Sequence, residues 1–166
     1  GWQVVVYGDY DADGICASSI MRGVLADFGI EAVVYVPERT TGYGLSTAAI
    51  DGIFEECFPQ LFITVDCGIS NAEEVEYIKE QGAEVIVTDH HELPAVLPDC
   101  ICINPKIADG YPYDNLCGAG VAFKVGCALI GEEAYKYLDY AAIATVADSV
   151  PLVGENRDIV AEGLRI

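Results

Sequence analysis

The chain has 166 residues, 52% of them apolar, and its 27 acidic residues against eight Lys and Arg give a net charge of −19. This length is typical of one domain, and no stretch reaches the roughly 18 uninterrupted apolar residues that span a bilayer. The acidity argues against a simple nucleic-acid-binding module, which usually carries a basic surface, but not against a nuclease whose bound cations reverse the local charge. We expect one soluble, cytoplasmic domain without a targeting segment.

Short runs rich in Val and Ile alternate along the chain with longer segments of helical pattern. Strands are predicted at residues 3–7, 32–36, 61–65, 84–88 and 100–103. Helices are predicted at about residues 15–28, 46–57 and 71–81, then, after a turn-rich loop at residues 104–117, at residues 118–130 and 135–147. The alternation predicts an α/β fold with a mostly parallel five-stranded sheet and helices on both faces.

For two of these helices, the sequence also predicts how the helix begins or how far it is buried. Ser70 and Glu73 form a capping-box pattern at the start of the helix at residues 71–81. The helix at residues 135–147 is nearly uncharged and has apolar residues on all sides, so we expect it to be buried.

The cysteines indicate a reducing environment. There are seven of them, an odd number, scattered and mostly within apolar runs. This pattern favours buried free thiols over a disulfide framework. Cys100 and Cys102 form only a CxC pair, without a second pair at zinc spacing, so a structural zinc is not expected.

Acidic residues and histidines directly follow three of the predicted strands. Asp9, Asp11 and Asp13 follow the first strand, Asp66 follows the third, and residues 89–91 (Asp-His-His) follow the fourth. In open α/β sheets, ligands bind beyond the carboxyl ends of the strands, so these segments should converge there. Carboxylates this close repel one another unless cations lie among them. The sequence therefore predicts a divalent-metal centre, for which carboxylate and imidazole ligands suit Mn²⁺, and Mg²⁺ with fewer nitrogen ligands.

Alternatives exist for several of these residues. The DYDADG segment also resembles the start of an EF-hand loop, but Ile20 stands where that loop needs a bidentate Glu, and a strand precedes it. For Asp9, two roles remain open, a turn residue and a metal ligand. Asp66 fits a bridging ligand better than a helix cap. Asp148, an isolated charge near the end of an apolar helix, remains open between a metal ligand and a solvated helix end.

The two histidines, His90 and His91, are the only ones in the chain, and their adjacency after a strand favours a functional pair. Asp89 is expected to hold an imidazole through a hydrogen bond instead of binding metal.

A second set of residues could contact a nucleic-acid strand. Arg39 and the backbone amides of residues 118–120, at a helix start, are candidates for binding non-scissile phosphates. Gly118 and Gly120 are equally consistent with close packing or turn geometry. Tyr43 is a candidate for stacking on a base, or simply a packed aromatic residue.

Together these motifs match a known family. DYDADG, VDCG, TDHHE and ATVADSVPL resemble the four motifs of the DHH phosphoesterases. The linking segments VPERTTGYGL, INPK, LCGAGVAFK and ENRDIVAEGL resemble its RecJ-like members, which are single-strand-specific 5′ to 3′ DNA exonucleases. The resemblance extends over essentially the whole chain. It implies a DHH-type, Rossmann-like catalytic domain at residues 1–166, a fragment without the DHHA1 and OB-fold domains into which such proteins continue.

The resemblance also implies the chemistry, a two-metal phosphodiesterase that hydrolyses single-stranded DNA in repair and recombination. The family pattern assigns ligands to two Mn²⁺ or Mg²⁺ ions: Asp11 and Asp66 to one, and Asp13, Asp66, His90 and Asp148 to the other. His91 then faces the scissile phosphate. Tyr7 stands where pyrophosphate-cleaving members have a metal-binding histidine, so the first ion is expected to recruit Asp9, water or substrate instead.

The partners implied are single-stranded DNA, the missing C-terminal domains, and a helicase or single-strand-binding protein, with no membrane. Two alternative functions remain open. One is a DHH phosphodiesterase of short oligonucleotides or cyclic dinucleotides, which the strong acidity favours. The other is a degenerate, non-catalytic replication scaffold, although such proteins usually lose the metal ligands that this chain retains.

Overall fold

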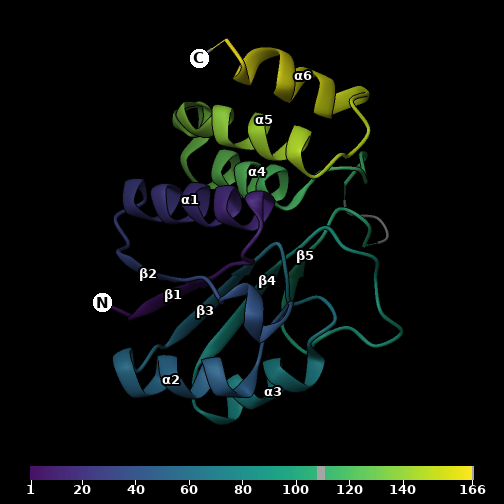
Figure 1. Ribbon diagram of the computed structural model, residues 1–166. Coiled ribbons are helices and arrows are strands. Elements are labelled where there is room, and N and C mark those ends of the chain that lie inside the picture. The colour runs from purple at the N-terminus through teal and green to yellow at the C-terminus, as the bar shows by residue number, and fades with distance from the viewer. Residues whose placement is uncertain (108–110, 166) are drawn as a thin grey trace.

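The computed structural model describes residues 1–107 and 111–165 and contains a single parallel sheet (Figure 1). Its five strands lie in the order β2-β1-β3-β4-β5. In chain order they are β1 (Val4–Tyr7), β2 (Ala32–Tyr35), β3 (Leu61–Val65), β4 (Glu84–Thr88) and β5 (Ile101–Ile103). The predicted α/β fold with a five-stranded parallel sheet is confirmed.

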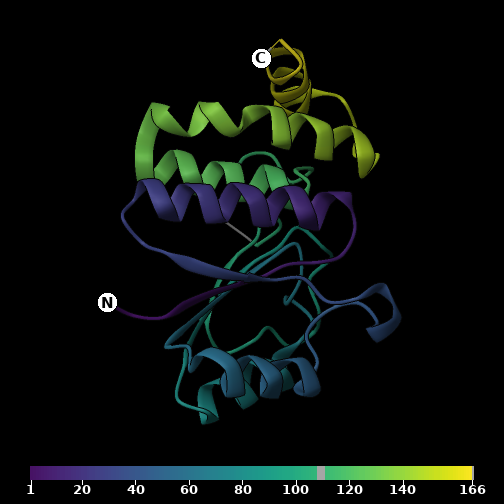
Figure 2. The same ribbon diagram turned by 60° about the vertical axis from the view of Figure 1, so that its left-hand side comes forward.

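Helices cover both faces of the sheet (Figures 1 and 2). One face carries α2 (Thr47–Cys57) and α3 (Ala72–Glu80). The other carries α1 (Ala12–Asp27) and α4 (Gly118–Ile130) side by side, with α5 (Leu138–Ala147) and then α6 (Gly154–Gly163) stacked outside them. Two short 3₁₀ helices, η1 (Arg39–Thr41) and η2 (Gly131–Tyr137), complete the described elements.

The central strand β1 explains how the core is built. Successive side chains of a strand point to opposite faces, so Val4 and Val6 join the cluster under α1 and α4, whereas Val5 and Tyr7 join the cluster over α2 and α3. All four residues are buried, as expected of a parallel strand that is covered on both faces. Each buried valine contributes about 1.5–3 kcal/mol to folding.

The strand order places a topological switch point between β1 and β3. From β1 the chain turns one way to reach the edge strand β2, and from β3 it continues the other way to β4 and β5. In open α/β sheets, the crevice beyond the carboxyl ends of the two strands at this point is the usual ligand site. Residues 9–13 and Asp66, which follow β1 and β3, therefore flank that crevice.

The predicted capping box of Ser70 with Glu73 is wrong. Asn71 is the N-cap residue of α3, and no side chain caps the helix backbone there. The amide of Asn71 donates to the carbonyl of Gly68 (3.0 Å), so Ser70 lies in a turn before the helix. The side chain of Asn71 instead donates to Glu74 (3.1 Å).

The segment at residues 135–147 also differs from its prediction. It is divided between η2 and α5, and only one face of α5 is buried. Ile143 is 52% exposed, and Tyr140 and Val146 lie on the same exposed face. The expectation of a helix buried on all sides is therefore wrong, because α6 and the layer of α1 and α4 cover only part of its circumference.

The loop at residues 104–117, the cysteines and the lengths of the helices bear on three further expectations. The predicted loop at residues 104–117 contains no helix or strand in residues 104–107 and 111–117, and residues 108–110 lie outside the described part. All seven cysteines are free thiols. Within residues 1–107 and 111–165, no helix combines the length and the apolar character needed to traverse a bilayer.

The burial pattern predicts different effects for two isoleucine truncations. Ile20 on α1 is fully buried against the sheet, so Ile20→Ala should lower the free energy of unfolding by about 2–5 kcal/mol. Ile143→Ala on the exposed face of α5 should lower it by less than about 1 kcal/mol. Urea unfolding of both variants measures the difference, and equal losses would contradict the exposed face described for α5.

Candidate metal centre

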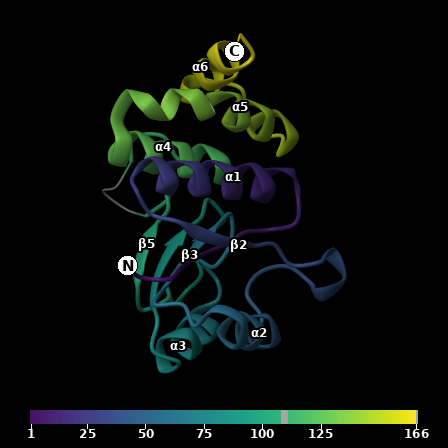
Figure 3. The same cartoon turned by 90° about the vertical axis from the view of Figure 1, so that its left-hand side faces the viewer.

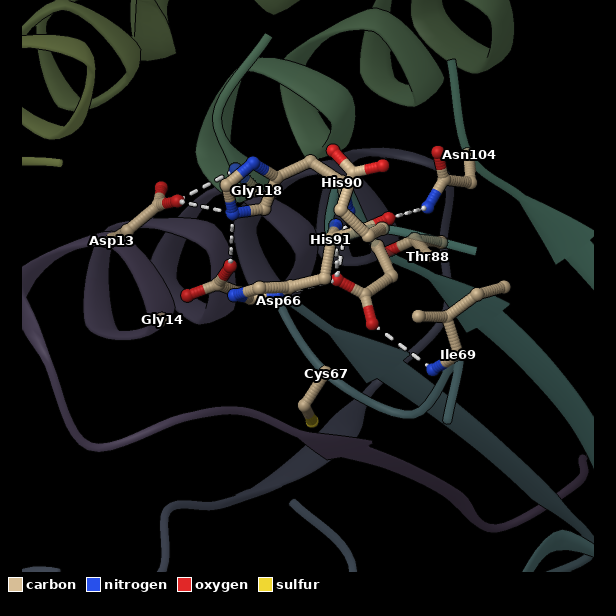
Figure 4. A network of polar contacts seen from close by, with 12 residues as sticks. Asp13, Gly14, Asp66, Cys67, Ile69, Thr88, His90, His91, Asn104 and Gly118 are labelled. Atoms are coloured by element: carbon tan, nitrogen blue, oxygen red, sulfur yellow. Dashed lines mark hydrogen bonds and ion pairs between the residues drawn. The ribbon is translucent and has the colours of Figure 1, made fainter. Parts of the chain in front are cut away.

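Side chains from four distant segments meet at the carboxyl edge of the sheet, and Figure 4 shows three of them, Asp13, Asp66 and His90. His90 Nε2 lies 3.1 Å from Asp66 Oδ1, 3.6 Å from Asp13 Oδ2 and 3.9 Å from Asp148 Oδ2. Asp148 is the C-cap residue of α5, which follows α1 and α4 in the sequence. The structure thus brings together residues that follow β1, β3 and β4 with one residue from the C-terminal helices.

The potential ligand atoms form three overlapping groups. In each group the atoms lie within 4.8 Å of one another: Asp9, Asp11 and Asp66; Asp13, His90 and Asp148; Asp66, His90 and His91. Asp66 and His90 each belong to two groups. The centre therefore has a side near Asp9 and Asp11 and a side near Asp13 and Asp148, and Asp66 and His90 join them.

In the part of the chain that the structure describes, two buried oxygen atoms of this centre find no hydrogen-bond donor, Asp9 Oδ1 and Asp66 Oδ1. The Asp66 atom lies only 3.1 Å from His90 Nε2, but the pair does not have hydrogen-bond geometry. Most buried polar atoms in proteins have a hydrogen-bond partner. Two atoms that bind the same metal ion also lie this close together, but without a hydrogen bond between them. The residues present therefore fit a divalent cation.

The electrostatics of the carboxylates support the same conclusion. Burial raises the pKa of Asp66, and the neighbouring charges of Asp13 and Asp11 raise it further. Burial is also the main cause of the raised pKa values of Asp9 and Asp148. A cation among these groups would favour their charged forms and reverse the shifts.

Asp11 has a structural contact as well. Its Oδ1 accepts a hydrogen bond from the amide of Gly14 (2.9 Å), which makes Asp11 the N-cap of α1. Because of this cap, α1 begins at Ala12, one turn before the predicted start at residue 15. The strand β1 immediately before it also rules out the EF-hand alternative, in which a helix would precede the loop.

The start of α4 binds Asp13. The amides of Gly118 and Ala119 donate to its two carboxylate oxygens at 2.6 and 2.7 Å. Helix N-termini attract anions because their amides and dipole both favour negative charge. The amide of Gly120 donates to Cys117 Sγ (3.4 Å). All three amides are thus engaged within the chain, and the helix start holds a carboxylate in the place where we expected a non-scissile phosphate.

Asp66 lies at a constrained point of the backbone. Its φ of 60° is left-handed, a conformation that Asp tolerates better than most residues but that still costs about 1–3 kcal/mol. Its amide donates to the carbonyl of Thr88 (3.0 Å). Gly118 packs directly against it, since a Cβ at residue 118 would lie 2.5 Å from Asp66 Cβ. The neighbouring backbone therefore fixes where the Asp66 carboxylate points.

Asp89 organises the two histidines instead of joining the ligand groups. Its fully buried carboxylate accepts hydrogen bonds from the amides of His90 (2.7 Å) and Ile69 (3.0 Å) and contacts His91 Nδ1 at 2.7 Å. Burial raises the pKa of Asp89, but the hydrogen bonds from His91 and Ile69 outweigh it and lower the pKa overall. The same contact with Asp89 raises the pKa of His91.

Arg39 contacts an aromatic ring and has no acidic partner among the described residues. Its guanidinium is 5.3 Å from the centroid of the Tyr10 ring, next to Asp9. It belongs to the loop that extends from β2, which Figure 3 shows reaching out from the sheet. Its role toward a phosphate stays a prediction.

Three residues acquire contacts that the sequence did not predict. Asn104, directly after β5, donates to the carbonyl of His91 (3.0 Å). The Tyr43 hydroxyl lies 2.9 Å from His91 Nδ1. Tyr7, at the position of the family's additional histidine, is buried on the α2 and α3 side, and its hydroxyl donates to the carbonyl of Gly44 (3.1 Å). In the sequence, only the position of Asn104 after a strand and the position of Tyr43 in a glycine-flanked loop pointed toward these contacts.

Comparison with known proteins gives consistent matches. The chain is 45% identical over 165 residues to the single-stranded-DNA-specific exonuclease RecJ of Bacillus subtilis, covering 98% of this chain and 21% of that protein. It is 39% identical over 169 residues to RecJ of Thermus thermophilus, covering 99% of this chain and 25% of that protein. A crystal structure of exonuclease RecJ bound to manganese superposes with a TM-score of 0.89 at 38% identity, over 99% of this chain and 43% of that chain.

The chain thus spans about a fifth to a quarter of the length of these two curated relatives. The model of the DHH family, N-terminal domain, matches residues 3–147. That match includes every strand and α1 to α5, together with all ligand candidates except Asp148. The chain therefore belongs to the DHH family.

Proposed function

We propose that this chain is the catalytic domain of a metal-dependent, RecJ-like exonuclease that hydrolyses phosphodiester bonds of single-stranded DNA from 5′ to 3′. The observation that carries the proposal is the convergence of buried carboxylates on His90 at the switch point of the sheet. The relatives from Bacillus subtilis and Thermus thermophilus are named as single-stranded-DNA-specific exonucleases. In this proposal the domain occupies residues 1–166, and DHHA1 and OB-fold domains continue the protein.

The groups in the centre suggest how two Mn²⁺ or Mg²⁺ ions would be held. Asp11 and Asp66, with Asp9, would hold one ion, and Asp13, Asp66, His90 and Asp148 the other. Asp9 is included because no described residue donates a hydrogen bond to its buried Oδ1. Oxygen-rich ligation with one imidazole suits both metals, and the structure with a TM-score of 0.89 is bound to manganese.

Each residue then has a defined task. When bound, the metal pair supplies a water of lowered pKa and stabilises the charge that develops on the phosphate. Asp66, whose backbone is fixed, sets the separation between the two sides of the centre. His91 presents Nε2 to the scissile phosphate, because its Nδ1 is held by Asp89. Arg39, which has no acidic partner within residues 1–107 and 111–165, binds a neighbouring phosphate of the strand.

A phosphodiesterase of short oligonucleotides or cyclic dinucleotides is the second candidate. It is favoured by the scarcity of free basic groups, since every lysine of the chain forms an ion pair with a carboxylate. A long strand would therefore need basic surface from the DHHA1 and OB-fold domains, or from a helicase or single-strand-binding partner. Hydrolysis rates on a length series from dinucleotides to long single strands separate the two candidates.

Replacing Asp66 tests the proposed chemistry. In the full-length protein, Asp66→Asn keeps the shape and the tolerance for a left-handed backbone but removes the charge shared by both sides of the centre. Mn²⁺-dependent release of nucleotides from 5′-labelled single-stranded DNA should fall about a thousand-fold, equivalent to several kcal/mol of lost stabilisation. Asp158→Asn, at an exposed position of α6, serves as the control. Wild-type rates for Asp66→Asn would remove Asp66 from the mechanism.

Metal binding can be measured without turnover. Mn²⁺ should raise the melting temperature of the wild-type protein, since a ligand at about 100 times its Kd stabilises by about 2.7 kcal/mol. Asp148→Asn should weaken Mn²⁺ binding at least about ten-fold and shift the stabilisation to higher metal concentration. Isothermal titration and thermal melts give both values. Equal Mn²⁺ affinities for the variant and the wild type would exclude Asp148 as a ligand.

A further inference from the structure

We propose that Tyr43 is a positioning residue that fixes the orientation of His91 through its hydroxyl group. The inference rests on the proposed function and assigns Tyr43 a task other than stacking on a base. Three observations carry it: the contacts of the Tyr43 hydroxyl, the incomplete burial of His91, and the anchoring of the loop that carries Tyr43.

The Tyr43 hydroxyl connects two parts of the centre. It lies 2.9 Å from His91 Nδ1 and 3.3 Å from the backbone carbonyl of Asp66. The carboxylate of Asp89, 2.7 Å from the same Nδ1, can only accept, so Nδ1 must carry a hydrogen. The phenol oxygen therefore accepts from Nδ1, and its own hydrogen goes to the Asp66 carbonyl, which also can only accept.

This arrangement settles which nitrogen of His91 is free. With Nδ1–H shared between Asp89 and Tyr43, Nε2 is the ring nitrogen left for another contact. The His91 side chain is 43% exposed, so the surrounding packing alone does not hold its ring. Asp89 is one polar contact from one direction, and the His90 ring lies against the imidazole with the centroids 4.4 Å apart. Tyr43 adds a second from another segment, and its ring meets the imidazole edge-on with the centroids 5.3 Å apart.

The loop that carries Tyr43 is itself anchored to the core. Tyr7 donates from its hydroxyl to the carbonyl of Gly44 (3.1 Å), and the amide of Leu45 donates to Asn71 Oδ1 (3.4 Å). Gly44 has a φ of 84°, and a Cβ there would lie 2.8 Å from Asn71 Oδ1. The fold thus sets the position of Tyr43 before any substrate arrives. Groups preorganised in this way contribute to catalysis because small displacements of a reacting group are costly.

Two substitutions of Tyr43 in the full-length protein separate positioning from base stacking. Tyr43→Phe keeps the ring and removes only the hydroxyl. With Mn²⁺ and single-stranded DNA, its kcat should fall about 10- to 100-fold, the usual effect of losing a group that orients a site residue, while KM and Mn²⁺ affinity stay at the wild-type values. Tyr43→Ala should reduce kcat to a similar extent. Tyr77→Phe removes a hydroxyl of α3 that donates to Asp51 of α2 (2.7 Å), outside the metal-ligand groups, and should keep the wild-type kcat.

Other results would overturn the inference. A wild-type kcat for Tyr43→Phe with a raised KM only for Tyr43→Ala would make Tyr43 a platform for a base. A loss of kcat accompanied by a loss of Mn²⁺ affinity and a lower melting temperature would make its role structural. If the wild-type protein itself shows no Mn²⁺-dependent hydrolysis of single strands, the proposed function fails and this inference with it, whereas an active wild type with an unimpaired Tyr43→Phe overturns the inference alone.

Discussion

Mutual repulsion between buried carboxylates determines which groups must surround them in this structure. Asp9, Asp13 and Asp66 lie within one crevice with almost no access to water, where like charges interact more strongly than at the surface. No lysine is available to neutralise them, since each is paired elsewhere. Backbone amides at the starts of α1 and α4 offset part of the charge. Divalent cations would offset the remaining charge, so the same repulsion that opposes burial of these carboxylates suits them to hold metal ions.

Much of this arrangement could be predicted from the sequence. The strands are recognisable because both faces of the sheet are covered, which requires nearly continuous apolar runs such as residues 4–7. In a parallel sheet the carboxyl ends of the strands share one edge, so acidic residues after β1 and β3 had to meet. Asp148 was harder to place, because nothing local in its helix shows that α5 ends at the same crevice.

The remaining features depend on contacts between residues that are far apart in the chain. Asp13 and Gly118 are separated by 105 positions, and Tyr43 and His91 by 48. Local patterns therefore suggested a phosphate site at the start of α4, where the fold places its own carboxylate. They also suggested a buried α5, because the apolar character of Ile143 does not reveal which neighbours cover it. Such features follow from tertiary packing and not from propensity or spacing.

The hydrogen bonds between Asp13 and the start of α4 determine when, during synthesis of the chain, the acidic centre can form. A nascent chain that has emerged only as far as β5 already contains most of the acidic residues and both histidines, but not the helix start that orients Asp13. Nor does it yet contain Asp148. The acidic centre therefore cannot assemble until α4 and α5 have been synthesised, so it forms only after most of the domain is complete.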